Sequence, residues 1–265
     1  MGRIFAIANQ KGGVGKTTTA VNIAAGLAAA ERRTLLVDGD PQANATSGLG
    51  VERAGERTTS YDVLLDPSSC QDAIIRSVQF PNLDLLPASP DLAAAEIELA
   101  SVDGRESRMR VALDAVRAQY EYIVIDCPPS LGLITLNMLA AADAVLIPLQ
   151  CEYYALEGLS QLLTTIGLVQ REINPGLVVD GVVLTMFDSR LNLSRQVAED
   201  AREHFAGLVF KSVIPRNIRL AEAPSFGKPI ISYDVASVGA QAYLGVVNEL
   251  IARVEQLAET HLAVA

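Results

Sequence analysis

Residues Gln10-Lys11-Gly12-Gly13-Val14-Gly15-Lys16-Thr17-Thr18 form the most informative segment of the chain. An apolar run at 3–8 precedes this segment, and an alanine-rich stretch with helical character, 15–30, follows it. A glycine-rich turn between a strand and a helix brings backbone N–H groups and a helix N-terminus to one point, where they bind phosphate oxygens. Glycine also tolerates positive φ and lets the backbone approach a ligand closely. The segment therefore predicts a phosphate-binding loop.

The loop contains two lysines, Lys11 and Lys16, and Gln10 stands where the usual pattern has a glycine. We expect Lys16 to reach the β and γ phosphates and the Thr17 hydroxyl to bind Mg²⁺. Lys11 could reach the same phosphates only if the loop bent it back sharply. It therefore either contacts the phosphates of a second subunit, as an arginine finger does, or is an ordinary solvated surface lysine.

Three aspartates follow two later apolar runs: Asp38 and Asp40 come after 35–37, and Asp126 comes after 122–125. Ligands of open α/β sheets bind outside the carboxyl ends of the strands, so these side chains can meet the loop in one crevice. We expect Asp126 to support Mg²⁺ through water, Asp40 to orient the attacking water, and Asp38 to anchor the metal shell or the loop. Any one aspartate could instead be a helix cap or a turn residue.

Apolar runs alternate with helical periodicity along the whole chain. The expected strands are 3–8, 34–37, 83–86, 122–125, 144–148 and 178–184. The expected helices are 15–30, 90–100, 107–119, 133–141, 155–171, 194–205 and 238–257. Unbroken apolar runs are typical of parallel strands buried on both faces. The sequence therefore predicts a single α/β domain over 1–265, a doubly wound, mostly parallel sheet with helices on both faces, with 51–59 as a surface loop.

Composition excludes several classes of protein. The chain has 265 residues, 50% of them hydrophobic and 20% charged, which is incompatible with a disordered chain. No apolar run approaches the roughly 18 residues of a membrane span, and no signal peptide is visible, so we expect a cytoplasmic location. Its three cysteines lie far apart without a Cys-x-x-Cys pair, which argues against a disulfide scaffold or a zinc ribbon.

The motifs resemble those of the deviant Walker A ATPases, in particular the ParA/Soj family of chromosome- and plasmid-partition ATPases. The matching segments are 11–18, 37–42 with 44–50, 125–130 and 213–220, within a likeness that extends from about residue 1 to 257. The resemblance implies a Mg²⁺-dependent ATPase that forms a homodimer bridged by two ATP molecules, with Lys11 of each subunit on the other's phosphates. It also implies nucleoid association through non-specific DNA binding in the ATP state. A ParB/Spo0J-like centromere-binding protein would stimulate hydrolysis.

The resemblance also assigns roles to individual residues. Phosphate and Mg²⁺ binding falls to Lys11, Gly12, Gly13, Val14, Gly15, Lys16, Thr17 and Thr18. Catalysis falls to Lys11, Lys16 and Asp40, and the metal site to Thr17, Asp126 and Asp38. Pro215 and Asn217 are candidates for the adenine pocket. The DNA contacts are expected from Arg219 first, then from Arg190 and Arg216.

Charge patterning bears on the expected DNA contacts. The formal net charge of the chain is −10, yet the segment 205–230 has four basic residues and one acidic residue, a local charge of +3. Dimerisation would double such a patch, and phosphate contacts add up with the number of charges neutralised. The alternative is a solvated loop without a nucleic-acid partner.

Two other functions remain alternatives. A MinD-like membrane-associated ATPase requires a C-terminal amphipathic helix with a basic face, whereas 246–265 contains only Arg253 against Glu249, Glu255 and Glu259. We therefore expect no membrane partner. A redox iron protein of the nitrogenase-reductase type requires paired thiolates from both subunits, whereas Cys70, Cys127 and Cys151 are isolated in the sequence.

Overall fold

The computed structural model describes residues 2–52, 57–152 and 155–264, and its central feature is one parallel β-sheet. The strands within these residues are β1 (Arg3–Ile7), β2 (Thr34–Asp38), β3 (Leu83–Leu86), β4 (Tyr122–Asp126), β5 (Ala144–Gln150) and β6 (Val178–Thr185). Their order in the sheet is β3-β2-β4-β1-β5-β6, and every neighbouring pair is parallel. The expected α/β fold is confirmed.

The unbroken apolar runs form strands that are buried on both faces. Every residue of β2, β4 and β5 is buried. Alternate side chains enter two separate cores, so Leu35 and Ile123 pack on one side of the sheet, and Leu36 and Val124 on the other. This two-sided burial is why these strands read as continuous hydrophobic segments.

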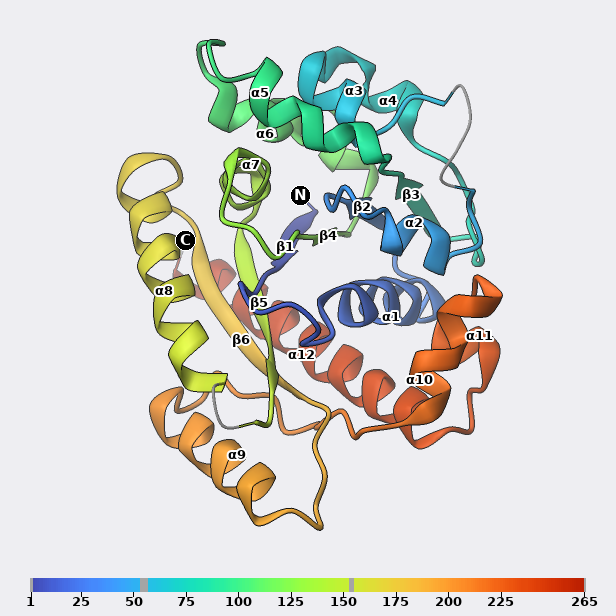
Figure 1. Ribbon diagram of the computed structural model, residues 1–265, viewed down its shortest axis with the longest axis vertical. Coiled ribbons are helices and arrows are strands. Elements are labelled where there is room, and N and C mark those ends of the chain that lie inside the picture. The colour runs from blue at the N-terminus through green and yellow to red at the C-terminus, as the bar shows by residue number, and fades with distance from the viewer. Residues whose placement is uncertain (1, 53–56, 153–154, 265) are drawn as a thin grey trace.

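Helices cover both faces of the sheet (Figure 1). One face carries α1 (Lys16–Ala29) and α12 (Val238–Val264). The short helices α10 (Ile218–Glu222) and α11 (Ile230–Tyr233) lie on the same face. The other face carries α6 (Arg108–Val116), α7 (Leu133–Ala141), α8 (Ala155–Glu172) and α9 (Asn192–His204). Beyond α6 and α7 lie α3 (Ser60–Leu65), α4 (Cys70–Ala73) and α5 (Ala95–Glu98).

Some elements differ from the sequence-based expectations. The expected helix 90–100 is a 3₁₀ turn at Pro90–Ala94 followed by the single turn α5, and 107–119 is α6 between two 3₁₀ turns, Arg105–Ser107 and Arg117–Gln119. Two further 3₁₀ turns, Pro67–Ser69 and Ala223–Phe226, were not expected. Neither were the helices α2 (Asn44–Gly48), α3, α4, α10 and α11, because four to six residues are too few to display a helical period.

The expected surface loop 51–59 is corrected at its end. Thr59 is buried and caps α3, with its backbone N–H donating to the carboxylate of Asp62 in a capping box. Residues 53–56 of that loop lie outside the described residues.

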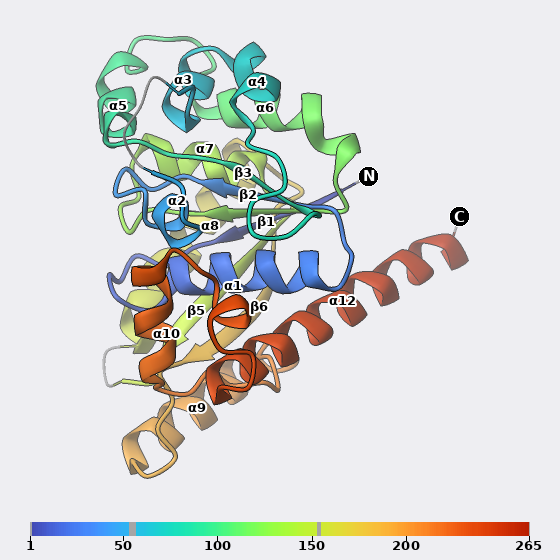
Figure 2. The same ribbon diagram turned by 90° about the vertical axis from the view of Figure 1, so that its right-hand side faces the viewer.

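The sheet brings the aspartates and the glycine-rich loop to one edge. Asp126 is the register partner of both Asp38 on β2 and Ile7 on β1, so these three strands end at the same level. The chain leaves β1 here, passes through the loop and enters α1. Figure 2 shows the two chain termini at the opposite edge of the molecule. Open α/β sheets bind ligands at this carboxyl edge.

Candidate active site

The loop between β1 and α1 has the backbone of a phosphate cradle. Gly13 and Gly15 have φ values of 76° and 89°, in the left-handed region that favours glycine. Gly12 has an ordinary φ, and a Cβ added there would meet nothing within 4 Å. The chain itself thus does not require glycine at position 12, and the space above the loop is open. Thr185, at the end of β6, supports the loop from below by donating its hydroxyl to the Val14 carbonyl oxygen at 2.9 Å.

Lys16 is a buried cation that faces two carboxylates. Its side chain is folded into the loop, with Nζ donating to the Lys11 carbonyl oxygen at 3.2 Å, and the residue is only 7% exposed. Burial lowers the pKa of Lys16, while nearby Asp126 and Asp40 act in the opposite direction. The ammonium group therefore lacks strong hydration and is well placed to exchange the carbonyl for a phosphate oxygen.

Asp126 is a fully buried carboxylate at the end of β4. Neither of its oxygens completes a hydrogen bond with a described residue, although the Thr17 hydroxyl lies close by. Burial raises the pKa of Asp126 well above its usual range, and Asp38 adds to the effect, whereas Thr17 and Lys16 partly counteract it. A buried orphan carboxylate beside a threonine hydroxyl fits a hydrated Mg²⁺, which takes one or two protein oxygens and keeps several waters.

Asp38 is already engaged within the protein. Its Oδ2 accepts hydrogen bonds from the backbone N–H and the hydroxyl of Thr46, both at 2.7 Å, and its Oδ1 accepts one from the Asp40 N–H at 3.2 Å. Burial raises the pKa of Asp38 to about 6, although these hydrogen bonds oppose the shift. Of the two expected roles, these contacts favour anchoring of the loop between β2 and α2 over metal binding.

Asp40 lies next to these groups with part of its carboxylate uncommitted. The residue is 7% exposed, and its Oδ1 accepts a hydrogen bond from the Gln42 N–H at 2.9 Å. Ala43, which follows, has a φ of 49° and is fully buried, so the packed core holds it in an unfavourable conformation. The structure thus fixes Asp40 at the carboxyl edge by contacts on both sides.

A cavity of about 190 Å³ lies between the start of α1 and the segment 214–221. Its lining includes Thr18, Pro215 and Asn217, which brings the two candidate adenine residues next to the phosphate loop. The Oδ1 atom of Asn217 is buried without a hydrogen-bond partner among the described residues. At the base of the cavity the Tyr243 hydroxyl of α12 lies 3.0 Å from that of Thr19.

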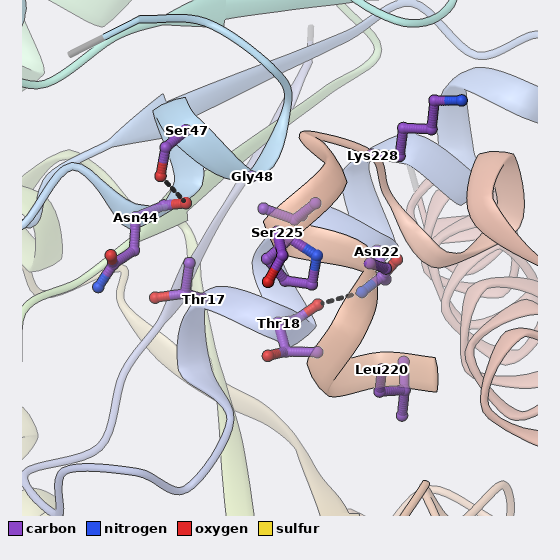
Figure 3. Close-up of a pocket in the computed structure, with 12 residues that line it drawn as sticks. Thr17, Thr18, Asn22, Asn44, Ser47, Gly48, Leu220, Ser225 and Lys228 are labelled. Atoms are coloured by element: carbon purple, nitrogen blue, oxygen red, sulfur yellow. Dashed lines mark hydrogen bonds between the residues drawn. The ribbon is translucent and has the colours of Figure 1, made fainter. Parts of the chain in front are cut away.

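A second cavity, of about 380 Å³, lies on the other side of Thr18 (Figure 3). The Asn22 side chain donates to the Thr18 carbonyl oxygen at 2.7 Å, and the Ser47 hydroxyl donates to the Asn44 carbonyl oxygen at 3.3 Å. Figure 3 shows Lys228 at the rim, pointing away from Thr18. Open space therefore flanks the first turn of α1 on both sides.

Lys11 points away from its own loop. Its Nζ lies 3.7 Å from the Oε2 atom of Glu152, just beyond β5, whereas its backbone N–H donates to the Asn9 side chain at 3.0 Å. Glu152 also pairs through Oε1 with Arg216 at 3.4 Å. The two lysines of the loop thus have opposite orientations: Lys16 folds inward and Lys11 extends outward.

The three candidate DNA residues all have acidic neighbours. Arg216 contacts Glu152, Arg219 contacts Glu222 at 3.0 Å and Asp234 at 3.6 Å, and Arg190 contacts Asp188 at 2.7 Å. Their side chains are nevertheless 53–86% exposed. Solvent screens exposed ion pairs of this kind and they add little stability, so a nucleic-acid phosphate can replace the carboxylates at little cost.

Sequence reasoning missed Asn9, Thr46, Thr185 and Glu152. Each of them contacts a site residue in the folded chain. Asn9 directly precedes the loop segment, but its bond to the Pro148 carbonyl oxygen on β5 exists only in the folded chain. Thr185 and Glu152 are far from the loop in the sequence and reach Val14 and Lys11 only through side-chain contacts. Only Thr46 lay within a segment that the resemblance covered.

The C-terminal helix uses its basic residue internally. Arg253 donates to the carbonyl oxygens of Asp180 and Leu208, and its guanidinium lies 4.0 Å from the centre of the Phe210 ring. Glu249 accepts hydrogen bonds from the backbone N–H groups of Lys211 and Ser212. No helix among the described residues combines the length and the apolar character needed to cross a membrane.

Comparison with known proteins gives matches over nearly the whole chain. A family model described as an AAA domain matches residues 2–179. Chromosome partitioning protein ParA of Myxococcus xanthus is 58% identical over 253 residues, covering 96% of this chain and 89% of the relative. Sporulation initiation inhibitor protein Soj of Bacillus subtilis is 57% identical over 252 residues, covering 95% and 99%. A solved structure of cobyrinic acid a,c-diamide synthase from Mycobacterium smegmatis, with a bound ATP analogue and magnesium, is 39% identical with a TM-score of 0.82, covering 95% of each chain.

Proposed function

This chain belongs to the ParA/Soj family of partition ATPases, and we propose that it is a dimeric switch which segregates a chromosome or plasmid. ATP is its substrate and Mg²⁺ its cofactor, in agreement with its family and with its phosphate-binding loop. In the proposed cycle, ATP joins two subunits, the dimer binds DNA without sequence preference, and hydrolysis separates them. The observation that carries this proposal is the outward orientation of Lys11 beside an inward Lys16.

Each residue at the carboxyl edge has a part in the proposed hydrolysis. The N–H groups of Gly12, Gly13, Val14 and Gly15 and the ammonium of Lys16 hold the phosphates, and the Thr18 hydroxyl lies beside them. Thr17 and Asp126 would hold Mg²⁺, which neutralises charge developing on the phosphoryl oxygens. Asp40 orients the attacking water, and Asp38 keeps Asp40 in place. Lys11 extends toward a second subunit and places its charge on that subunit's triphosphate.

The adenine base is proposed to occupy the cavity beside Pro215 and Asn217. The buried Oδ1 atom of Asn217 accepts no hydrogen bond from a described residue. The exocyclic amine of adenine supplies a donor, whereas guanine presents a carbonyl oxygen at that position. Replacing Asn217 with Ala should weaken ATP binding and narrow the preference for ATP over GTP, by about tenfold. Competition binding with the two nucleotides measures both effects.

DNA binding is proposed to depend on the dimer because the three candidate arginines of one subunit can neutralise only a few phosphates. Arg219, Arg190 and Arg216 lie on segments that follow β6 and precede or begin α10. A dimer doubles their number on a chain that is otherwise acidic, so affinity rises steeply when two subunits join. A ParB/Spo0J-like partner would accelerate hydrolysis and release the DNA, and the protein would be cytoplasmic and nucleoid-associated.

The DNA step is tested by titrating a random-sequence duplex with protein in the presence of an ATP analogue, ADP or no nucleotide, at stepped salt concentrations. We expect strong binding only with the ATP analogue. A plot of log affinity against log salt concentration gives a slope that reflects the number of phosphate contacts. Arg219→Ala should reduce the magnitude of this slope by about one for each phosphate contact that is lost. Arg33→Ala removes an exposed arginine just before β2 and serves as the matched control. Equal affinity in the three nucleotide states would contradict the proposal.

A further inference from the structure

The side chain of Asn9 links the start of the phosphate loop to strand β5. The residue is only 4% exposed. Its Nδ2 donates to the Pro148 carbonyl oxygen at 2.8 Å, and its Oδ1 accepts a hydrogen bond from the Lys11 N–H at 3.0 Å. Both polar atoms of this buried amide are therefore satisfied, one by β5 and one by Lys11.

The two bonds mark the point at which the chain leaves the sheet. β1 pairs with β5 as far as Ile7, and the Ala8 N–H still donates to the Leu146 carbonyl oxygen at 3.2 Å. The next carbonyl of β5 facing β1 belongs to Pro148, and the side chain of Asn9 takes the place of a main-chain donor there. The main chain can therefore leave the sheet at Asn9. The same side chain also accepts the hydrogen bond from the Lys11 N–H and so orients the backbone of the turn.

Among the hydrogen bonds that the Lys11 backbone makes with described residues, the one that its N–H donates to Asn9 is independent of the phosphates. The Lys11 carbonyl oxygen accepts its hydrogen bond from Lys16 Nζ, and that ammonium is the group expected to move to the phosphates. The side chain of Lys11 is held only by an exposed ion pair with Glu152, at 3.7 Å. Once both of these contacts are exchanged, the hydrogen bond to Asn9 still holds the backbone from which Lys11 extends.

We propose that Asn9 is a positioning residue for Lys11 and that it acts on dimer formation rather than on nucleotide binding within one subunit. This inference rests on the proposed function. The remainder of the loop has its own supports, since Thr185 holds Val14 and α1 begins at Lys16. Loss of the Asn9 amide therefore misdirects Lys11 while the phosphate cradle persists.

The test compares two affinities in the full-length chain. ADP affinity, measured with a fluorescent analogue, reports the cradle of one subunit. The dimer dissociation constant, measured by sedimentation with a non-hydrolysable ATP analogue and Mg²⁺, reports Lys11. For Asn9→Ala we expect the dimer to weaken by at least about tenfold while ADP affinity changes by less than about threefold. Asn9→Asp retains the acceptor for the Lys11 N–H but loses the donor to the Pro148 carbonyl oxygen, so we expect its dimer also to be weaker than that of the wild type.

A matched control separates positioning from loss of stability. Asn174 is a structural amide whose Nδ2 donates to the carbonyl oxygens of Leu139, Ala140 and Ala142 at the end of α7. Asn174→Ala should lower the melting temperature and leave both affinities unchanged. The inference is overturned if Asn9→Ala dimerises like the wild type or if it loses ADP affinity in parallel. A wild type that binds ADP but stays monomeric with the ATP analogue would instead overturn the proposed function itself.

Discussion

The protonation of Asp126 should report metal binding directly. Its pKa is raised well above the usual range by burial and by Asp38, so the free protein holds a proton there to a higher pH than an exposed aspartate does. A bound cation favours the charged form and expels this proton. The affinity for Mg²⁺·ADP should therefore increase with pH until Asp126 is charged in the free protein, and binding should release protons below that point.

Calorimetry with preformed Mg²⁺·ADP in two buffers of different ionisation enthalpy measures this release. Asp126→Asn should release fewer protons than the wild type when Mg²⁺·ADP binds. Asp143→Asn alters a carboxylate that pairs with Arg117 at the opposite edge of the sheet, and it should retain the wild-type value. Equal proton release by the wild type and Asp126→Asn would show that Asp126 does not sense the metal.

Glu152 should oppose dimer formation slightly, because Lys11 must leave it to reach another subunit. The ion pair is long, at 3.7 Å, and its side chains are 34% and 46% exposed, so the pair is worth less than about 1 kcal/mol. Glu152→Gln is expected to tighten the ATP-dependent dimer by up to about fivefold. Sedimentation at several protein concentrations checks this value. Glu255→Gln, which removes an exposed partner of Arg32, is the control, and a weaker dimer in Glu152→Gln would refute the reasoning.

Single residues also show why the sequence could not define the whole site. The aspartates and the glycine-rich loop were recognisable because each follows an apolar strand. Asp38 was assigned two alternative roles, since its hydrogen bonds to Thr46, eight residues away, exist only in the folded chain. Ala43 and Met186 have φ values of 49° and 50° beside the site, but neither is a glycine, so no residue type signalled these turns.

At the level of elements, the prediction was accurate where the pattern was long. All six described strands and the helices α1, α7, α8, α9 and α12 lie close to their predicted positions, because buried parallel strands and helices of nine or more residues leave a clear pattern. The short helices α2 and α10 carry or flank site residues and were missed. Their conformation is set by contacts with other segments, such as the packing of Leu220 against Gly239.

The packing of α1 against α12 should be sensitive to one added methyl group. A Cβ at Gly26 would lie 2.7 Å from Cγ2 of Val247, so the helices would have to separate. We expect Gly26→Ala to lower the free energy of unfolding by about 1–2 kcal/mol, because overpacking outweighs the gain in helix propensity. Denaturant unfolding measures the change.

Gly167→Ala in α8 is the matched control, since a Cβ there meets nothing within 4 Å. It should raise the free energy of unfolding by about 0.5–1 kcal/mol through helix propensity alone. The double variant Gly26→Ala/Val247→Ala should recover part of the loss caused by Gly26→Ala. If Gly26→Ala were as stabilising as Gly167→Ala, the close contact between α1 and α12 would be wrong.

At the scale of the whole molecule, every proposed phosphate contact lies at the carboxyl edge of one sheet. The exposed glycines Gly12 and Gly13 and the outward Lys11 face solvent there, whereas the chain termini lie at the far edge. The second subunit that we propose would therefore approach this edge. In the proposed cycle, DNA binding and release follow from a single event, in which two such edges join around ATP and separate after hydrolysis.

Sedimentation equilibrium of the full-length chain with Mg²⁺ and a non-hydrolysable ATP analogue tests this event most directly. We expect a dimer with the analogue, a monomer with ADP, and a monomer for Lys11→Ala with either nucleotide although its ADP affinity stays near the wild-type value. A Lys11→Ala protein that dimerised as tightly as the wild type, or a wild type that remained monomeric when saturated with the analogue, would contradict the account.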